Sequence, residues 1–128
     1  MGLFGNIFGG SDNEDNGVEW SVLNSLEQID TIIEESANVP VVIFKHSTRC
    51  SISSSALNRF ERGWDSNEAG ELKPYFLDLI SFRDVSNALA RKLNVEHQSP
   101  QIIVLKNKKA VFNTSHMSIN FDDLKKYV

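Results

Sequence analysis

Cys50 is the only cysteine of the chain, and its type and position point to thiol chemistry. It lies between an apolar, β-branched run at residues 41–44 and the first turn of a predicted helix. A helix N-terminus carries unpaired N–H groups and a partial positive charge, which favour a thiolate over a thiol. Lys45, His46 and Arg49 add positive charge nearby. Such a placement would make Cys50 a nucleophile near neutral pH.

The other interpretation of Cys50 is structural, because a lone cysteine is often a buried small apolar residue. Its neighbours are polar, however, which is unusual for a core position; they include Ser47, Thr48, Ser51 and Ser53. Hydroxyl groups at these positions either donate hydrogen bonds to a thiolate or cap the helix. We expect Thr48 to cap the helix and Ser53 to have a mixed role. From these local features alone, both interpretations of the cysteine stay open.

Ser53 stands where a C-x-x-C redox pair has its second cysteine. Serine cannot form a disulfide, and one cysteine excludes any internal bridge and any secreted disulfide framework. Thiol–disulfide exchange at Cys50 would therefore stop at a mixed disulfide and require an external thiol.

A second candidate element is Ser99-Pro100, directly before a predicted strand. In the strand order set out below, this turn is expected beside the N-terminus of the Cys50 helix. A cis peptide bond would present the backbone of Ser99 to an extended substrate, whereas a trans proline would only begin the strand. His97, close to this turn, is the histidine that we expect to contact a substrate.

Length, composition and charge describe an ordinary single domain of 128 residues, with 41% hydrophobic and 23% charged residues. Four of the 17 acidic residues lie in residues 1–19, which have no Lys or Arg, so the remainder balances 13 acidic against 13 basic side chains. A neutral body argues against a general nucleic-acid binder. Residues 1–17 are predicted to be a disordered tail and residues 18–128 the domain. Because neither a signal peptide nor a transmembrane segment is evident, we expect a cytoplasmic protein.

Periodicity predicts the order β-α-β-α-β-α-β-β-α, an α/β fold with a central mixed sheet of four to five strands and helices on both faces. The predicted strands cover residues 20–23, 41–44, 75–80, 101–105 and 110–113. A capping box at Ser25 and Gln28 opens the first helix. The helix after Cys50 is expected to bury one face, formed by Ile52, Ala56, Phe60 and Trp64. The last helix is expected from about Ser118, burying Phe121, Leu124 and Val128.

This order, with a cysteine after the first central strand and a proline before the terminal hairpin, resembles the thioredoxin fold. The segments 45–53, 83–87, 98–101 and 115–116 more specifically resemble the monothiol bacilliredoxin family of the bacillithiol redox system. The likeness spans about residues 20–128. One departure is Ser51, because the family commonly has proline directly after the cysteine. Serine adds an N–H and a hydroxyl near the sulfur.

The resemblance implies a thiol–disulfide oxidoreductase that removes bacillithiol from mixed disulfides on proteins through a Cys50 intermediate. Bacillithiol would be a co-substrate, and no permanently bound cofactor is expected. Lys45 and Arg49 are candidate contacts for its malate carboxylates. The partners would be S-bacillithiolated proteins, the low-molecular-weight thiol and a reductase. The protein itself is expected to be a monomer. The alternatives are a thioredoxin-fold binding module without catalysis and a glutathione-linked monothiol glutaredoxin-like protein. No metal site is expected, because the usual ligand spacings are missing.

Overall fold

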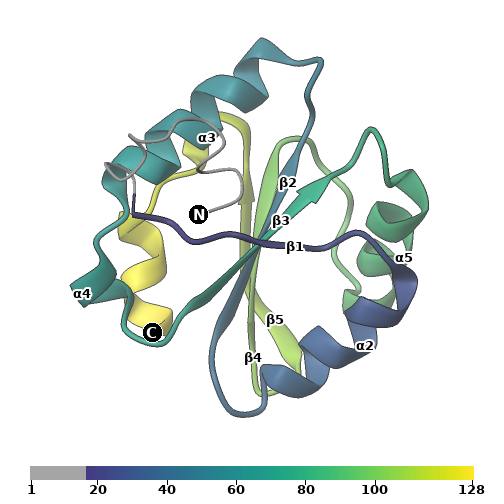
Figure 1. The fold of residues 1–128 in the computed structure, drawn as a ribbon, viewed down its shortest axis with the longest axis horizontal. Coiled ribbons are helices and arrows are strands. Elements are labelled where there is room, and N and C mark those ends of the chain that lie inside the picture. The colour runs from purple at the N-terminus through teal and green to yellow at the C-terminus, as the bar shows by residue number, and fades with distance from the viewer. Residues whose placement is uncertain (1–16) are drawn as a thin grey trace.

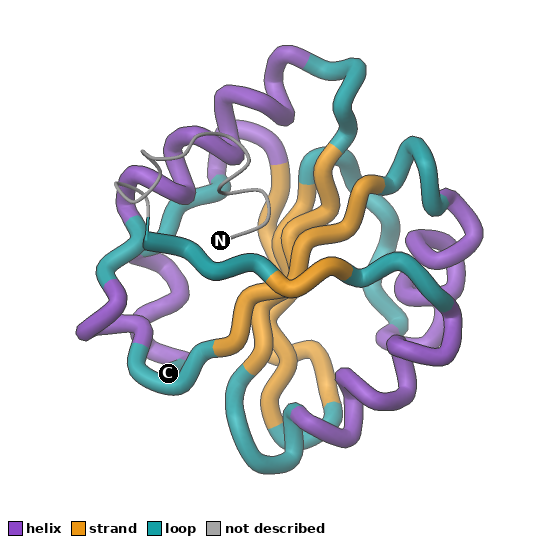
Figure 2. Tube along the Cα trace, in the orientation of Figure 1, coloured by secondary structure: helices purple, strands orange, loops and turns teal. Residues whose placement is uncertain are grey.

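The computed structural model describes residues 17–128 as an α/β protein with helices on both faces of a central sheet (Figure 1, Figure 2). Residues 1–16, which make up nearly all of the expected tail, lie outside the described residues. The strands are β1 (Ser21–Val22), β2 (Val41–His46), β3 (Lys73–Asp78), β4 (Gln101–Lys106) and β5 (Lys109–Ser115). The helices are α2 (Leu26–Glu35), α3 (Ser51–Gly63), α4 (Ser66–Ala69), α5 (Arg83–Leu93) and the 3₁₀ helices η2 (His116–Ser118) and η3 (Asp122–Tyr127).

The five strands form one mixed sheet in the order β1-β3-β2-β4-β5. β3 runs parallel to both β1 and β2, whereas β4 runs antiparallel to β2 and β5 antiparallel to β4. The predicted fold class and the antiparallel terminal hairpin are therefore confirmed. All six residues of β2 are buried, as expected for a strand that is covered on both faces.

The core consists of two apolar clusters, one on each face of the sheet. Side chains of a strand alternate between faces, so Val41 and Ile43 join one cluster while Val42 and Phe44 join the other. Helices α2 and α5 cover the first face, and α3 with the C-terminal η3 covers the second (Figure 1). This division determines which helix each functional side chain of β2 can reach.

Local sequence explains the start of α2. The predicted capping box forms, and the Ser25 N–H donates to Gln28 Oε1 at 2.9 Å. Pro40 then precedes β2.

Among residues 17–128, no helix is long and apolar enough to cross a membrane.

The expected buried face of α3 is wrong at its first position. Ile52 is 47% exposed, whereas Ala56 and Phe60 are fully buried. Ile52 lies in the first turn, next to the partly exposed Cys50. The first turn of α3 therefore buries Ser53 and not Ile52, and the apolar buried face begins at Ala56.

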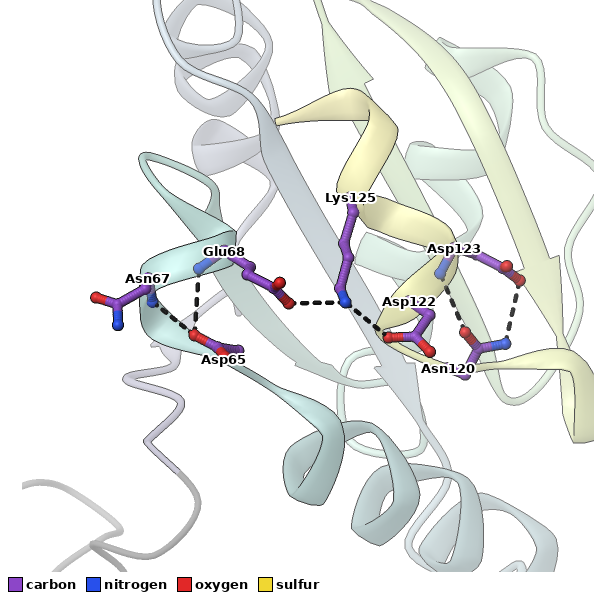
Figure 3. A network of polar contacts seen from close by, with 7 residues as sticks. All are labelled: Asp65, Asn67, Glu68, Asn120, Asp122, Asp123 and Lys125. Atoms are coloured by element: carbon purple, nitrogen blue, oxygen red, sulfur yellow. Dashed lines mark hydrogen bonds and ion pairs between the residues drawn. The ribbon is translucent and has the colours of Figure 1, made fainter.

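The expected C-terminal α-helix is also wrong in type. Two short 3₁₀ helices, η2 and η3, occupy this segment; Phe121 and Leu124 are buried, but Val128 is 41% exposed. The two helices have three and six residues, and 3₁₀ geometry is used mostly in such short segments. Lys125 ties η3 to α4 through an ion pair with Glu68 at 2.7 Å, and it also pairs with Asp122 of its own helix at 3.1 Å (Figure 3).

Candidate active site

The candidate site lies at one end of the sheet, where three segments distant in sequence meet. Lys45 near the end of β2 pairs with Gln101 at the start of β4, and Gln101 pairs in turn with Ser115 at the end of β5. Pro100 therefore lies at the same end of the sheet as the 47–50 loop that carries Cys50. The His116 N–H donates to the carbonyl of Pro100 at 3.1 Å and closes this end of the hairpin.

Cys50 is the N-cap residue of α3 and is partly exposed. Its carbonyl accepts hydrogen bonds from the N–H groups of Ser53 at 3.1 Å and Ser54 at 3.2 Å, and its own N–H donates to Ser47. The backbone thus places the thiol at the positive end of the helix dipole, as the sequence predicts. Cys50, and not Thr48, holds the N-cap position, so the expected capping role of Thr48 is wrong.

Ser53 connects the first turn of α3 to the end of β2. Its hydroxyl is fully buried, accepts the N–H of Ser47 at 3.0 Å and lies 2.8 Å from His46 Nδ1. The imidazole of His46 packs against Phe44 and Phe76 on the α3 side of the sheet. Burial lowers the pKa of His46, although nearby Asp78 opposes this shift. At neutral pH, His46 therefore contributes no positive charge to the site.

Lys45 is oriented differently from the sequence-based expectation. As the neighbour of His46 in a strand, it points to the opposite face of the sheet, and it is fully buried there. Its ammonium donates to His97 Nδ1 at 2.8 Å. Burial lowers the pKa of Lys45 to about 8, and the positive charge of Arg83 makes a smaller contribution in the same direction. A buried lysine cannot contact the carboxylates of a substrate in solution, so the expected malate contact of Lys45 is wrong.

The 94–100 segment carries His97, Ser99 and Pro100. The Ser99–Pro100 peptide bond is cis, Pro100 is buried, and His97 is half-buried. Gln101, which is fully buried, fixes this segment by donating to the Glu96 carbonyl at 3.0 Å and accepting the Gln98 N–H at 3.2 Å. Burial and the charges of Lys45 and Arg83 lower the pKa of His97.

The remaining candidates lie on the solvent side of the site. Thr48, Arg49 and Ser51 are exposed around the thiol, with Ser51 as the first residue of α3. Arg49 is thus the expected basic residue that stays accessible. Asp78, at the end of β3, accepts hydrogen bonds from the N–H groups of Ile80 and Ser81 in its own turn.

Two residues of this end of the molecule were missed by sequence reasoning. The positive charge of Arg83, at the start of α5, helps to lower the pKa of both Lys45 and His97. Gln101 holds the 94–100 segment by its hydrogen bond to Glu96. The available signal was Lys45 itself, because a cation that follows four consecutive apolar residues in a buried strand requires a polar partner. Within the described residues, no group of three His, Cys, Asp or Glu side chains is placed to hold a metal ion.

Comparison with known proteins agrees with this architecture. Residues 21–124 match the family model described as monothiol bacilliredoxin BrxC. A solved thioredoxin-fold structure described as an oxidoreductase is 34% identical, with a TM-score of 0.70, over 82% of this chain and 89% of that chain. Fasciola hepatica thioredoxin is 19% identical (TM-score 0.61; 83% and 93% covered).

The thioredoxin of Trypanosoma brucei brucei is 17% identical, with a TM-score of 0.62, over 91% of each chain. At this level of identity the two thioredoxins show the fold alone. The family match covers most of the chain, including Cys50 and Pro100. The chain therefore belongs to the monothiol bacilliredoxin family, a group of thiol redox proteins with a thioredoxin fold.

Proposed function

We propose that the protein is a monothiol thiol–disulfide oxidoreductase that removes bacillithiol from mixed disulfides on proteins. The observation that carries this proposal is the setting of Cys50. The thiol is partly exposed at the N-cap of α3, while Ser53 occupies the second redox position and bonds to the end of β2. A partly exposed thiol with no second thiol in the chain fits exchange with an external partner.

In the first step, the Cys50 thiolate attacks the bacillithiol sulfur of an S-bacillithiolated protein. A disulfide bond forms between Cys50 and bacillithiol as the original disulfide breaks, and the protein thiolate leaves with the electron pair. That thiolate takes a proton from solvent. The protein substrate is thereby reduced, and Cys50 is left as the mixed disulfide.

In the second step, an external thiolate attacks the bacillithiol sulfur of this mixed disulfide. With bacillithiol as the attacking thiol, the products are oxidised bacillithiol and the Cys50 thiolate. A partner reductase that supplies a thiol would perform the same exchange. Neither step requires a permanently bound cofactor.

Substrate binding is proposed for the Ser99–Pro100 segment and for the exposed Arg49, whose loop lies at the same end of the sheet. An extended substrate backbone would pair with Ser99 as an added strand, which is a common way for a sheet to bind peptides. Arg49 supplies a cation for the malate carboxylates of bacillithiol. We also propose that the protein acts as a monomer in the cytoplasm, with the protein disulfide and the low-molecular-weight thiol as its partners.

The test is exchange with a purified protein that carries one S-bacillithiolated cysteine. Intact-mass measurements should show loss of bacillithiol from that protein and a transient bacillithiol adduct on Cys50. Cys50→Ser should lose both signals, whereas Ser55→Ala, an exposed change in the same helix, should keep them. Unmodified masses for the wild type after hours would instead favour a binding module.

Glutathione-linked exchange is the second candidate, because the same thiol chemistry serves either low-molecular-weight thiol. A parallel arm with the same protein substrate carrying glutathione separates the two. Faster release of bacillithiol than of glutathione supports the proposal, and the reverse order contradicts it.

A further inference from the structure

Lys45 is a fully buried cation in a strand that is otherwise apolar up to its last residue. Burying a charged group costs free energy, which lowers the pKa of this ammonium to about 8. An aliphatic residue would extend the apolar run of Val41–Phe44 without this cost. The thiol chemistry proposed for Cys50 does not use Lys45 directly, because its side chain points to the face opposite α3.

The ammonium of Lys45 joins two segments that are 52 residues apart. It donates to His97 Nδ1 at 2.8 Å and so ties β2 to the middle of the 94–100 segment. That segment continues directly into Ser99 and Pro100, which stand at the same end of the sheet as Cys50. Gln101 holds the same segment at Glu96 and Gln98. The 94–100 segment is therefore held by β4 through Gln101 and by β2 through the hydrogen bond between Lys45 and His97.

We propose that Lys45 is a positioning residue for thiol exchange: by bonding His97 Nδ1, it holds the 94–100 segment so that the Ser99–Pro100 backbone is in register to receive the protein substrate of Cys50. This inference rests on the proposed function. Lys45 acts through His97 and does not contact the reacting sulfur atoms.

The chemistry of the two groups supports a specific arrangement of protons. An ammonium has three N–H donors and no acceptor, so His97 Nδ1 must accept and a neutral imidazole carries its proton on Nε2. Lys45 and Arg83 both disfavour a second proton on His97. The hydrogen bond thus requires a charged lysine and a neutral histidine, which is the state expected at neutral pH.

Four variants test the positioning role. Lys45→Met removes the donor and keeps an unbranched side chain, and His97→Leu removes the acceptor. His97→Asn keeps an acceptor, because Asn Oδ1 takes nearly the place of His Nδ1. The double variant Lys45→Met/His97→Leu removes both partners and leaves no unpaired charge. Exchange with an S-bacillithiolated protein and alkylation of Cys50 by iodoacetamide are measured for each.

We expect kcat/KM for exchange to fall about tenfold in Lys45→Met and in His97→Leu, mainly through KM. The double variant should fall no further, whereas His97→Asn should retain at least a third of the wild-type value. Alkylation should stay within twofold of wild type in all four, because a small reagent does not need the Ser99 backbone. NMR of the wild type should show His97 protonated on Nε2, with that preference lost in Lys45→Met.

If the wild type performs exchange and Lys45→Met has the same kcat/KM as the wild type, the positioning role is overturned and the proposed function stays intact. Additive losses in the double variant would do the same, because independent losses mean that the two residues do not act as a pair. Failure of the wild type to exchange at all would contradict the proposed function itself. Since the double variant buries no unpaired charge, its expected folding keeps the test usable even where His97→Leu unfolds.

Discussion

Ser53 Oγ lies 2.8 Å from His46 Nδ1, and this contact joins the first turn of α3 to the last residue of β2. The same hydroxyl accepts the N–H of Ser47 at 3.0 Å. The residue that replaces a resolving cysteine is therefore part of the support for the loop that presents Cys50. Its loss affects both the stability of the loop and the placement of the thiol.

Ser53→Ala should lower the free energy of unfolding by about 1–3 kcal/mol, the cost of leaving buried polar groups without a partner. The Ser47 N–H and the His46 ring both lose their bond to the hydroxyl in this variant. Urea unfolding at neutral pH measures the change. Ser55→Ala, exposed on the same helix, should remain within about 0.5 kcal/mol of wild type, and equal losses in the two variants would contradict the role of Ser53.

Ser53→Cys should convert the monothiol site into a dithiol site. Residues at i and i+3 share one face of a helical turn, so the new thiol can reach a Cys50 mixed disulfide. It would displace the bound thiol and form an internal disulfide. Non-reducing intact mass should show loss of two hydrogen atoms and no retained adduct. An adduct on Cys50 as stable as in wild type would show that the Ser53 position cannot act as a resolving thiol.

Acid should destabilise the protein before its ordinary carboxylates titrate. The pKa values of His46 and His97 are lowered by burial, below the ordinary histidine value of about 6.5 that applies in the unfolded chain. As pH falls through 6.5, the unfolded state binds protons that the folded state does not, so unfolding becomes easier. The urea concentration at the midpoint of unfolding should thus decrease as the pH is lowered from 7.5 to 5.5.

Two matched variants assign this pH dependence. His97→Asn should reduce the slope of stability against pH, because the half-buried imidazole of His97 no longer titrates. His116→Asn, a change at an exposed histidine, should keep the wild-type slope. A midpoint that is the same at both pH values in the wild type would contradict the assignment.

Lys45→Met should raise stability at pH 7 while lowering exchange activity. The folded-state pKa of about 8 lies below the ordinary 10.5, so the wild type carries a penalty below pH 8 that is relieved as pH rises toward 10.5. Methionine is also unbranched and carries no charge, so it avoids the free-energy cost of burying the ammonium. Urea midpoints for both proteins at pH 7 and pH 10 measure the difference, which should shrink at pH 10. A larger advantage of methionine at pH 10 would show that burial of the ammonium is not the cause.

The sequence was sufficient for the fold because strong local patterns agree with one another. The apolar run of β2, the capping box at Ser25 and the alternation of strands with helices each specify one element and together one topology. Helix α4 was missed because four residues are too few for periodicity, although Asp65 caps it by accepting the Asn67 and Glu68 N–H groups. The single serine-for-cysteine change at position 53 was likewise readable from spacing alone.

The site was less predictable because its partners are far apart in sequence. Proximity to Cys50 along the chain indicated that Lys45, His46 and Arg49 add positive charge around the thiol and that Thr48 caps the helix. The pleat of β2 instead sends Lys45 to His97, and Thr48 is exposed in the loop without capping the helix. The isomer of the Ser99–Pro100 bond, which the sequence left open, is cis.

The alternation of Lys45 and His46 makes the register of β2 a functional property in its own right. A one-residue insertion upstream in this strand would exchange the two side chains between faces. The ammonium would then point toward Phe76 of the neighbouring strand, and the imidazole would face Arg83. A graft of residues 45–53 onto another thioredoxin fold must therefore preserve the register of the strand as well as the sequence of the motif.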